Sequence, residues 1–542
     1  MYFSANATVT RTFRISMSNE FGLSTVRYTS SPIPRSDAER SSAWCRRRVG
    51  FSAAQPAAQR PRAVTRSRWG RSFVIACRDE GRSGSPRWEP IRARRASPRT
   101  SSIAEKNTLD RRRGMASSSA LRGRMKSIDI GIIGCGTAGS AAALFLSRAG
   151  HRVTVYERVA DPGPVGAGVM LQPTGQAVLS LLGLREAVLA RCAPITRMTC
   201  HTAGGRELFD LRYGDIPGDH VGYGLHRGVL FEHLFRAVKA ADVRLRLGVT
   251  VENLENAGNG RGLYFLTPEG ERLGPHAACI VADGARSQLR DDTSIRKSIR
   301  PYPWGALWFV GEDPAGAFRG ELAQVVRGTQ RMVGLLPTGL GPGDGPAADK
   351  VSLFYSLPAA GLDAWREAGL DAWKREVRAI APSAEPVLDQ IESAEQVLFA
   401  RYHDVSMYPW NDERVVYLGD AAHAMSPQLG QGANLALWDA MVLAEALAGH
   451  ASVPIALDAY SRARRSHLDY YQFATRWLTP FFQSDLTPLG WLRDLGFPIA
   501  AALPPLRRLM VRSMCGIAQG IGIDAPMVLP APDPPPRLGP AA

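Results

Sequence analysis

The chain has 542 residues, enough for about three domains. Its 45% hydrophobic and 21% charged content is typical of a folded globular protein and excludes a wholly disordered chain. The formal net charge of +16 would by itself indicate a nucleic-acid or membrane-surface protein, so the position of that charge has to be examined.

The excess charge lies entirely in residues 1–124, which hold 26 Arg and Lys against 8 Asp and Glu. The rest of the chain is close to neutral, with 40 basic and 42 acidic residues. The leader is rich in Arg, Ser and Pro and has no helical or strand period, so we expect no packed core in it. Three interpretations stay open: a long transit peptide, a basic arm that binds polyanions or, as we favour, an extension upstream of a natural start at Met115 or Met125.

Cysteine spacing and hydropathy exclude several classes of protein. No pair among the seven cysteines has the C-x-x-C spacing of a redox or zinc site, and their odd number argues against a disulfide framework. We therefore expect a reducing, cytoplasmic location and no metal. No run of 18 apolar residues is present, so we expect no transmembrane segment.

The first motif follows a predicted strand at 128–133 and reads Gly134-Cys135-Gly136-Thr137-Ala138-Gly139. A predicted helix at 140–148 and a second strand at 152–156 follow, and that strand ends at Glu157-Arg158. Strand, glycine turn, helix and distant acid together are typical of a dinucleotide site, in which the glycines allow a tight turn, close pyrophosphate approach and close packing. Glu157 can accept hydrogen bonds from a ribose, but the motif leaves FAD, NAD and NADP open.

A second motif follows the predicted strand at 278–282 and reads Asp283-Gly284-Ala285-Arg286-Ser287, with Arg290 beyond it. Taken alone, it is also compatible with a turn and a capped helix. The third follows a predicted strand at 415–418 and comprises Gly419-Asp420-Ala421-Ala422-His423, Pro427 and the stretch Gly430-Gln431-Gly432-Ala433-Asn434. An apolar-periodic helix then continues from Leu435, so the glycine-rich stretch would aim its free N–H groups at a ligand.

The three motifs, in this order and spacing, resemble the signatures of single-component FAD-dependent monooxygenases with the para-hydroxybenzoate hydroxylase-like fold, over roughly residues 126–520. The resemblance implies that the first motif binds the ADP half of FAD and that Asp283 lies near both FAD and a transient NAD(P)H. It also implies that Asp420 binds the ribityl chain, that 430–434 lie against the isoalloxazine ring, and that Arg227 lies near the FAD phosphates. Gly166-Ala167-Gly168 and Pro173 match the segment beside the flavin.

The resemblance implies an α/β fold in which a Rossmann-like FAD-binding domain with a parallel sheet is interrupted by a mixed-sheet substrate domain and followed by C-terminal helices. We predict strands at 302–310, 322–336, 350–357 and 396–402 and helices at 361–380, 383–392 and 456–480. The expected domains are a leader at 1–124, a FAD-binding domain at 125–200, 226–295 and 403–470, a substrate domain at 201–225 and 296–402, C-terminal helices at 471–522 and a Pro-rich disordered tail at 523–542.

The implied activity is a monooxygenase in which NAD(P)H reduces tightly bound FAD, O₂ forms a flavin C4a-hydroperoxide, and one oxygen enters an aromatic or otherwise hydrophobic molecule. The cofactor performs this chemistry, so no catalytic residue is assigned, although Tyr223, His226 and His403 are candidate bases by residue type. His423 is expected to pack or hydrogen-bond within its turn. A halogenase- or reductase-like flavoprotein on the same fold remains the alternative, and a basic nucleic-acid-binding protein is a third hypothesis.

The absence of a second dinucleotide fold argues against a disulfide-reductase flavoprotein, since the Gly-dense stretch 339–345 is expected to be a surface loop. We expect no specific nucleic-acid partner and either a monomer or a homodimer. The segment Leu506-Arg507-Arg508-Leu509-Met510 leaves open a weak contact with a membrane surface, although packing on the FAD domain is favoured.

Overall fold

The computed structural model describes residues 125–258, 260, 262–291, 293–343, 348–520 and 527–530. The expected leader therefore lies outside the described residues, as does the expected tail except for 527–530. In that short piece, the Met527 amide donates a hydrogen bond to the Ile517 carbonyl over 3.0 Å.

The first sheet is mostly parallel and has six strands in the order β17-β18-β11-β1-β2-β7. Its strands are β1 (Asp129–Ile133), β2 (Arg152–Glu157), β7 (Val243–Leu247), β11 (Ala278–Val281), β17 (Asn411–Asp412) and β18 (Val415–Tyr417). The central strands are continuous apolar runs, as expected for strands buried on both faces. Because β1, β2, β11 and β18 run parallel, the turns that follow them meet at one edge of the sheet.

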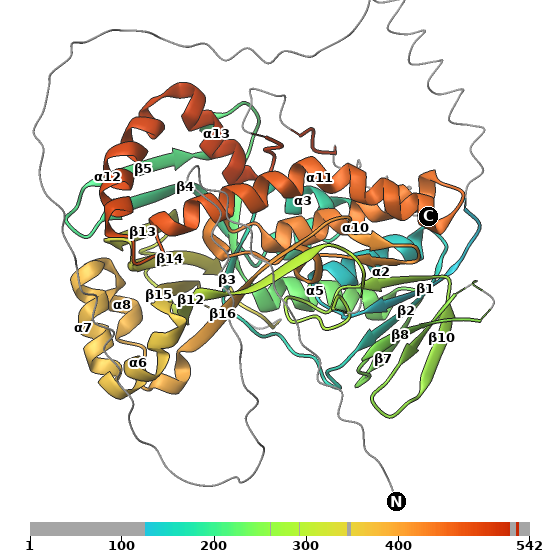
Figure 1. Cartoon of the computed structure of the whole chain (residues 1–542). Helices are drawn as coiled ribbons and strands as arrows, with labels where there is room; N and C mark the ends of the chain where they lie inside the picture. The colour runs from blue at the N-terminus through green and yellow to red at the C-terminus, as the bar shows by residue number, and fades with distance from the viewer. Residues whose placement is uncertain are drawn as a thin grey trace, which may run out of the picture. The chain divides into compact units, whose positions relative to one another are not determined.

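Helices cover this sheet. Figure 1 shows α11, α10 and α2 one below another beside it, and α2 also contacts β1 and β2. The helices of this part are α2 (Thr137–Arg148), α3 (Pro173–Leu181), α4 (Arg185–Leu189), α5 (Arg227–Ala240), α9 (Asp420–His423), α10 (Gly432–Gly449) and α11 (Val453–Leu478). A small antiparallel sheet of β8 (Asn253–Asn256), β9 (Leu263–Leu266) and β10 (Arg272–His276) is inserted before β11.

The second large sheet is mixed and has nine strands, in the order β16-β12-β15-β14-β13-β4-β6-β3, with β5 paired to β4. Its strands are β3 (Gly168–Leu171), β4 (Ala193–Thr202), β5 (Glu207–Arg212), β6 (Gly222–His226), β12 (Lys297–Glu312), β13 (Gly320–Arg327), β14 (Arg331–Gly339), β15 (Lys350–Pro358) and β16 (Leu398–Met407). The helices α6 (Leu362–Ala368), α7 (Leu370–Ile380) and α8 (Glu385–Leu388) close one side, where Trp373 and Val377 pack with Tyr355.

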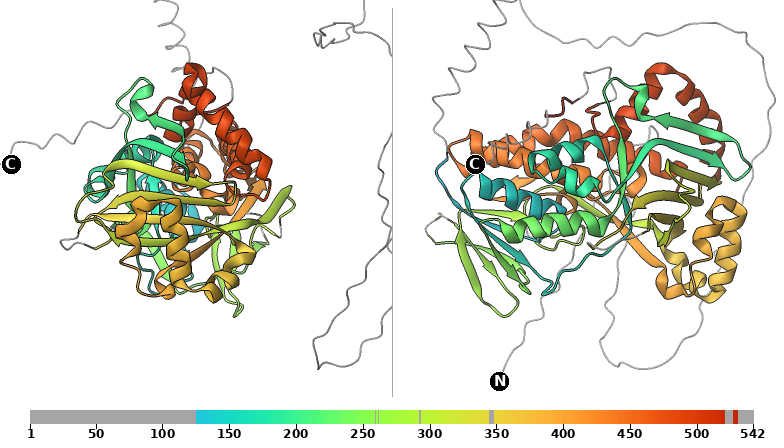
Figure 2. Two further views of the ribbon diagram at one scale, coloured as in Figure 1. Left: turned by 90° about the vertical axis from the view of Figure 1, so that its left-hand side faces the viewer. Right: turned by 180° about the vertical axis from the view of Figure 1, so that it is seen from behind.

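The last two helices, α12 (Thr487–Ala502) and α13 (Pro504–Cys515), pack beside β5. Both views in Figure 2 place them at the outer edge of the described part of the chain. Phe481, Phe482 and Val511 join them to a core that also includes Leu208 and Phe209 of β5.

Several predicted boundaries differ from the structure. The expected strand at 322–336 is two strands, β13 and β14, joined by a turn at Gly328, whose φ is +58°. The expected helix at 361–380 is broken at Gly369, whose φ of +82° is incompatible with a continuing helix, and the expected helix at 383–392 shortens to α8. Turn glycines thus divided elements that apolar periodicity had merged.

Three expected domain boundaries fall inside strands, and the one at 225 separates His226 from the rest of β6. The boundary at 200 cuts β4, which pairs with β13 and β6 of the nine-stranded sheet, and β3 belongs to that sheet as well. The boundary at 402 cuts β16, which pairs with β12 along its length. The chain therefore enters the second sheet earlier and leaves it later than composition indicated.

The Gly-dense stretch at 339–343 is a surface loop only in part. Gly339 ends β14 and is buried, and a Cβ there would lie 2.3 Å from the Arg191 carbonyl oxygen. Leu340 donates to that same carbonyl over 3.0 Å. No helix in the described part of the chain is long and apolar enough to span a membrane.

Candidate active site

The first glycine motif forms the turn between β1 and α2. Gly134 has φ +98°, and a Cβ there would lie 2.5 Å from the Ala282 carbonyl oxygen. A Cβ on Gly139 would lie 2.0 Å from the Gly134 carbonyl oxygen, so both positions exclude a side chain. Gly136 differs, because a Cβ there would meet nothing within 4 Å. Open space above Gly136, at the N-terminus of α2, is what an approaching phosphate would need.

Glu157 ends β2 and lies beside the same turn. Its carboxylate accepts hydrogen bonds from the Cys135 amide over 2.8 Å and from the Val159 amide over 3.0 Å. Thr137 and Ala138 open α2, while Arg158, next to Glu157, is exposed. The expected acid thus holds the glycine turn in shape as well as presenting a carboxylate at the sheet edge.

The second motif follows β11 without forming a helix, so the capped-helix interpretation is wrong. Asp283 is partly buried, and within the described residues its Oδ1 atom has no hydrogen-bond partner. Burial raises the pKa of the Asp283 carboxyl, although the neighbouring Ser287 hydroxyl, Arg290 and Arg158 act in the opposite direction. Gly284, with φ +90°, makes the turn that follows.

Arg290 joins the second motif to the third. Its fully buried guanidinium donates to the carbonyls of Ala285 and, over 3.0 Å, of Ala421. Burial lowers the pKa of Arg290, and among described residues its Nε has no partner. A buried cation with a free N–H and a buried carboxylate oxygen without a donor are costly unless a ligand satisfies them.

The third motif begins after β18 at Gly419, whose φ is +57°, and Asp420 is exposed at the start of α9. A Cβ on Gly419 would lie 3.1 Å from the Ala138 Cβ, so the third motif packs directly on the first. The structure therefore brings all three motifs together, although they are separated by more than a hundred residues in the sequence.

The stretch Pro427–Asn434 runs from the loop after α9 into the first turn of α10. Its last residue, Asn434, is fully buried, donates through Nδ2 to the Met170 carbonyl over 3.0 Å and accepts from the Gln172 amide over 2.8 Å. The Asn434 side chain thus ties the loop to β3 and is already satisfied within the fold. Gly430 (φ +61°), Gly432 and Ala433 are partly exposed at the start of α10.

Arg227 opens α5 and is exposed. Its amide donates to the Ala167 carbonyl over 3.0 Å, and a Cβ on Gly166 would lie 3.1 Å from the Arg227 Cδ. The segment at 166–168 and Arg227, matched separately in the sequence, are therefore neighbours in space.

Sequence reasoning missed a buried ionic network behind the third motif. Asp439 of α10 accepts from the Gly419 amide (2.9 Å), binds His423 (2.6 Å) and accepts from Arg464 of α11 (2.7 Å). Burial alone would raise the pKa of Asp439, but His423 and Arg464 outweigh it and lower the pKa to about 2. His423 is thus a residue that holds its turn, as expected.

The same network reaches the C-terminal segment. Arg464 contacts His467 Nδ1 over 2.7 Å, and His467 Nε2 binds the Gly516 carbonyl over 2.8 Å. Burial and Arg464 lower the pKa of His467 to about 3, so its ring is neutral at pH 7. Gln431 donates to the Ser513 and Met514 carbonyls, which anchors the glycine-rich loop on the end of α13. Because these partners lie on separate helices, no local spacing in the sequence could have identified them.

The three candidate bases do not form one cluster. His226 caps α5 by accepting from the Gly228 amide over 3.1 Å, and burial lowers the pKa of its ring. Tyr223 lies in β6 and pairs with Leu171, whereas His403 lies in β16 opposite Pro301. No described group of three or more His, Cys, Asp or Glu side chains could hold a metal ion.

The residues present fit FAD. The fit rests on the open space at Gly136, the unpartnered Asp283 Oδ1 and Arg290 Nε atoms, and the partly exposed Gly430, Gly432 and Ala433, all at the carboxyl edge of one parallel sheet. Ligands of open α/β sheets bind at that edge.

Comparisons with known proteins agree. A family model described as "FAD binding domain" matches residues 127–470. Kynurenine 3-monooxygenase of Salinispora arenicola is 30% identical over 364 residues, which cover 62% of this chain and 76% of that protein. The putative FAD-dependent monooxygenase YetM of Bacillus subtilis is 27% identical over 342 residues, which cover 61% of this chain and 88% of that protein.

Solved structures show the same fold. The crystal structure of PqsL, a probable FAD-dependent monooxygenase from Pseudomonas aeruginosa, superimposes with a TM-score of 0.59 at 22% identity, covering 69% of this chain and all of that one. A single-residue variant of Klebsiella pneumoniae HpxO, complexed with FAD, superimposes with a TM-score of 0.59 at 20% identity. The match covers 72% of this chain and 97% of that one. The chain belongs to the family of single-component FAD-dependent monooxygenases, which are oxidoreductases with FAD as cofactor.

Proposed function

We propose that the protein uses NAD(P)H and O₂ to insert one oxygen atom into an aromatic or otherwise hydrophobic small molecule. The observation that carries the proposal is the convergence of three turns at one sheet edge, where Asp283 Oδ1 and Arg290 Nε are buried without protein partners among the described residues. The membership of the chain in a monooxygenase family supports the reaction class.

Each motif would hold one part of FAD. Gly134, Gly136 and Gly139, with Thr137 and Ala138, would receive the pyrophosphate at the α2 N-terminus, where free N–H groups and the helix dipole favour an anion. Glu157 would accept from the adenosine ribose and Arg227 would pair with a phosphate. Arg158, exposed beside Glu157, would face the same half of the cofactor.

The second and third motifs would hold the flavin half. Asp283 and Gly284 would face FAD and the passing NAD(P)H, and Asp420, after Gly419, would accept from the ribityl hydroxyls. Pro427, Gly430, Gly432 and Ala433 would line the ring edge, with Asn434 fixing their backbone through β3. Bound FAD supplies two-electron transfer and activation of O₂, while these residues orient it and keep water away.

An aromatic substrate class is supported by the second sheet and by the relatives. Trp308 and Phe354 are directly paired across β12 and β15, with ring centroids 5.0 Å apart, and Trp308 donates to the Tyr402 hydroxyl over 2.9 Å. All three side chains are partly buried, on a sheet that adjoins the FAD region through β3. A relative of similar fold is a 2-methyl-3-hydroxypyridine-5-carboxylic acid oxygenase, and PqsL has been solved with 2-aminobenzoylacetate.

The test is to purify the full chain with FAD and screen phenols, hydroxypyridines and aminobenzoyl compounds for stimulated NAD(P)H oxidation under ¹⁸O₂. We expect one labelled oxygen in the product. Product formation without label would contradict the monooxygenase reaction, and a protein that cannot be loaded with FAD would contradict the site.

A matched pair of variants tests the site itself. Asp283→Asn removes the buried carboxylate and should weaken FAD binding about tenfold or more, the usual effect of losing one charged hydrogen bond. Asp371→Asn changes an exposed carboxylate in α7, away from the three turns, and should bind FAD as the unmodified chain does.

A further inference from the structure

Helix α12 is apolar on two opposite sides. On its inner side, the Phe497 ring centroid lies 5.6 Å from that of Phe481 and 5.7 Å from that of Phe482. The buried Arg493 guanidinium donates hydrogen bonds to the carbonyls of Gly328 and Phe481 over 2.8 and 2.9 Å. This side is therefore packed against the rest of the protein, and it fixes which side of the helix faces outward.

The outward side is a continuous apolar stripe at helical spacing. Between Leu486 and Leu506 every exposed residue is uncharged, and Thr487 is the only polar one. Trp491 is 75% exposed. The stripe, which we call the α12 face, consists of Trp491, Leu492, Leu495 and Ile499 of α12, followed by Leu503 at its C-cap and Leu506 of α13. Apolar side chains gathered in this way on a water-soluble surface mark an interaction site, whereas scattered ones do not.

The α13 end of the α12 face carries positive charge. Helix α13 carries three arginines and no acidic residue, and Arg508 is exposed two residues after Leu506. Asp494 beside the face is paired with Arg493 over 2.7 Å, whereas the exposed Asp485, at the opposite end, accepts from the uncharged Gln330 over 2.8 Å. A partner that covers the face thus meets hydrocarbon side chains in the middle and positive charge at one end.

We propose that the α12 face docks on a membrane surface that contains anionic lipid. The outward side of α12 presents tryptophan, leucine and isoleucine, and the exposed Arg508 follows at the start of α13, a combination typical of helices that lie in the plane of a bilayer. Tryptophan favours the boundary between water and lipid, and arginine pairs with anionic headgroups. Both views in Figure 2 place α12 and α13 at the outer edge, where a flat surface can reach them.

The experiment is vesicle co-sedimentation of the full-length, FAD-loaded protein with phosphatidylcholine vesicles containing about 30% phosphatidylglycerol. Because the +18 charge of residues 1–124 would also bind anionic lipid, binding is measured in about 0.15 M and about 0.5 M salt, and the readout is the difference between variants that share those residues. Ile499→Asp is compared with Ile455→Asp. Both isoleucines are 54% exposed, but Ile455 lies near the start of α11 and is not part of the α12 face.

We expect Ile499→Asp to reduce vesicle binding about tenfold or more, because an isoleucine that would enter the lipid boundary is replaced by a charge. Ile455→Asp should bind as the unmodified chain does, and both variants should keep their FAD, which shows that they are folded. Equal binding by both variants, or no binding by the unmodified chain, would overturn the proposal. Loss of a dimer in Ile499→Asp without vesicle binding would overturn it too, and would assign the face to a second copy of the chain instead.

Discussion

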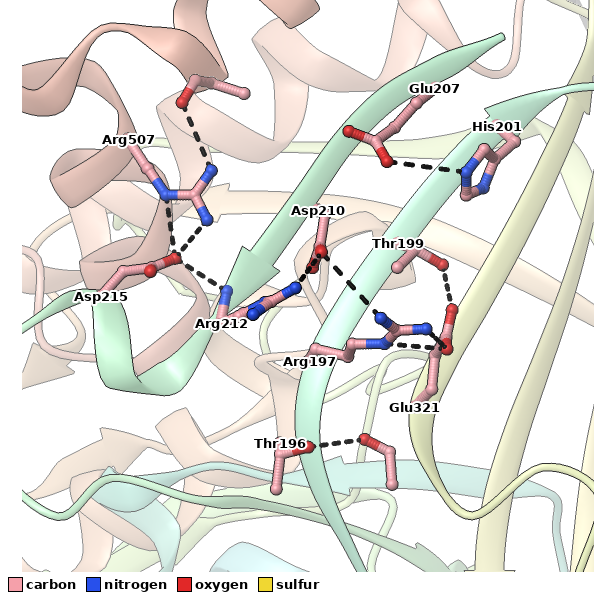
Figure 3. Close-up of polar contacts among 12 residues, drawn as sticks. Thr196, Arg197, Thr199, His201, Glu207, Asp210, Arg212, Asp215, Glu321 and Arg507 are labelled. Carbon is pink, nitrogen blue, oxygen red and sulfur yellow. Dashed lines mark hydrogen bonds and ion pairs between the residues drawn. The ribbon is translucent and has the colours of Figure 1, made fainter. Parts of the chain in front are cut away.

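The molecule contains two networks of acidic and arginine side chains that differ chiefly in burial. In one, Asp439, His423 and Arg464 are almost completely buried behind the third motif. In the other, shown in Figure 3, Arg197 binds Glu321, Arg212 binds Asp210, and Arg507 binds Asp215, all at a partly exposed edge formed by β4, β5, β13 and α13. The buried network contacts the turn at Gly419, which would hold FAD. The exposed network instead links β4 to β13 and α13 to the turn after β5.

The comparison teaches that ion-pair geometry alone does not set the importance of a pair. Distances are similar in both networks, but solvent screens the exposed pairs and replaces their hydrogen bonds when they break. A buried charge that loses its partner has no such replacement. Variants in the two networks should therefore differ by about 2–4 kcal/mol in their effect on stability.

The largest effect is expected for Arg464→Met, which keeps the length of the side chain but leaves Asp439 without its 2.7 Å partner. We expect a loss of about 3–5 kcal/mol in the free energy of unfolding, together with weaker FAD binding, because the Gly419 amide is held by the same carboxylate. Urea unfolding of the FAD-loaded chain measures the change. A loss below about 1 kcal/mol would mean that this network contributes no more than an exposed pair.

Next in size is the contrast between two glycines of the first motif. Gly139→Ala places a Cβ 2.0 Å from the Gly134 carbonyl oxygen and should cost about 3 kcal/mol of stability. Gly136→Ala meets no protein atom within 4 Å, so the thermal midpoint without FAD should stay unchanged while FAD affinity falls about tenfold. Unchanged FAD affinity in Gly136→Ala would exclude the open space as the cofactor site.

The glycine motifs and the buried Asp439 network also show how much of the site the sequence could predict. The glycine and acid motifs predicted the turns after β1, β11 and β18, because each depends on local chemistry: Gly134 on a positive φ, and Gly139 on close packing. Their assembly at one edge followed from the rule for parallel strands. Residues whose role depends on distant partners, such as Asp439 with Arg464, were not predictable from local pattern.

In the second sheet, we predicted β12, β15 and β16, merged β13 with β14, predicted no strand at β3, β4, β5 or β6, and placed domain limits inside β4 and β16. Those limits depend on which strands pair, and pairing over more than a hundred residues, as between β4 and β13, leaves no local signature. The segment at 506–510 was expected to pack on the FAD domain. Leu509 does so, whereas Leu506, one turn earlier at the start of α13, is exposed.

A smaller effect is expected from acid. The pKa of His467 is lowered from 6.5 in the unfolded chain to about 3, so the unfolded state binds the proton more readily as pH falls. The stability that neutral His467 contributes is present above about pH 6.5 and is lost progressively toward pH 3. Between about pH 7.5 and about pH 5.5 we expect a loss of about 1 kcal/mol.

His467→Gln retains an acceptor for Arg464 and a donor for the Gly516 carbonyl but does not titrate, so its unfolding free energy should fall less over the same pH range. Urea midpoints at both pH values provide the measurement. Equal acid sensitivity in the two proteins would assign the loss to other groups.

The smallest effect is expected in the exposed network. Arg507→Gln removes two contacts with Asp215, of 2.9 and 2.7 Å, between α13 and the turn after β5. Because both side chains are partly exposed, the loss of stability should be under about 1 kcal/mol and should shrink further in high salt. The loss in Arg464→Met should be insensitive to salt, since water and ions do not reach that pair. Equal salt dependence in the two variants would contradict the view that burial, rather than contact geometry, separates the networks.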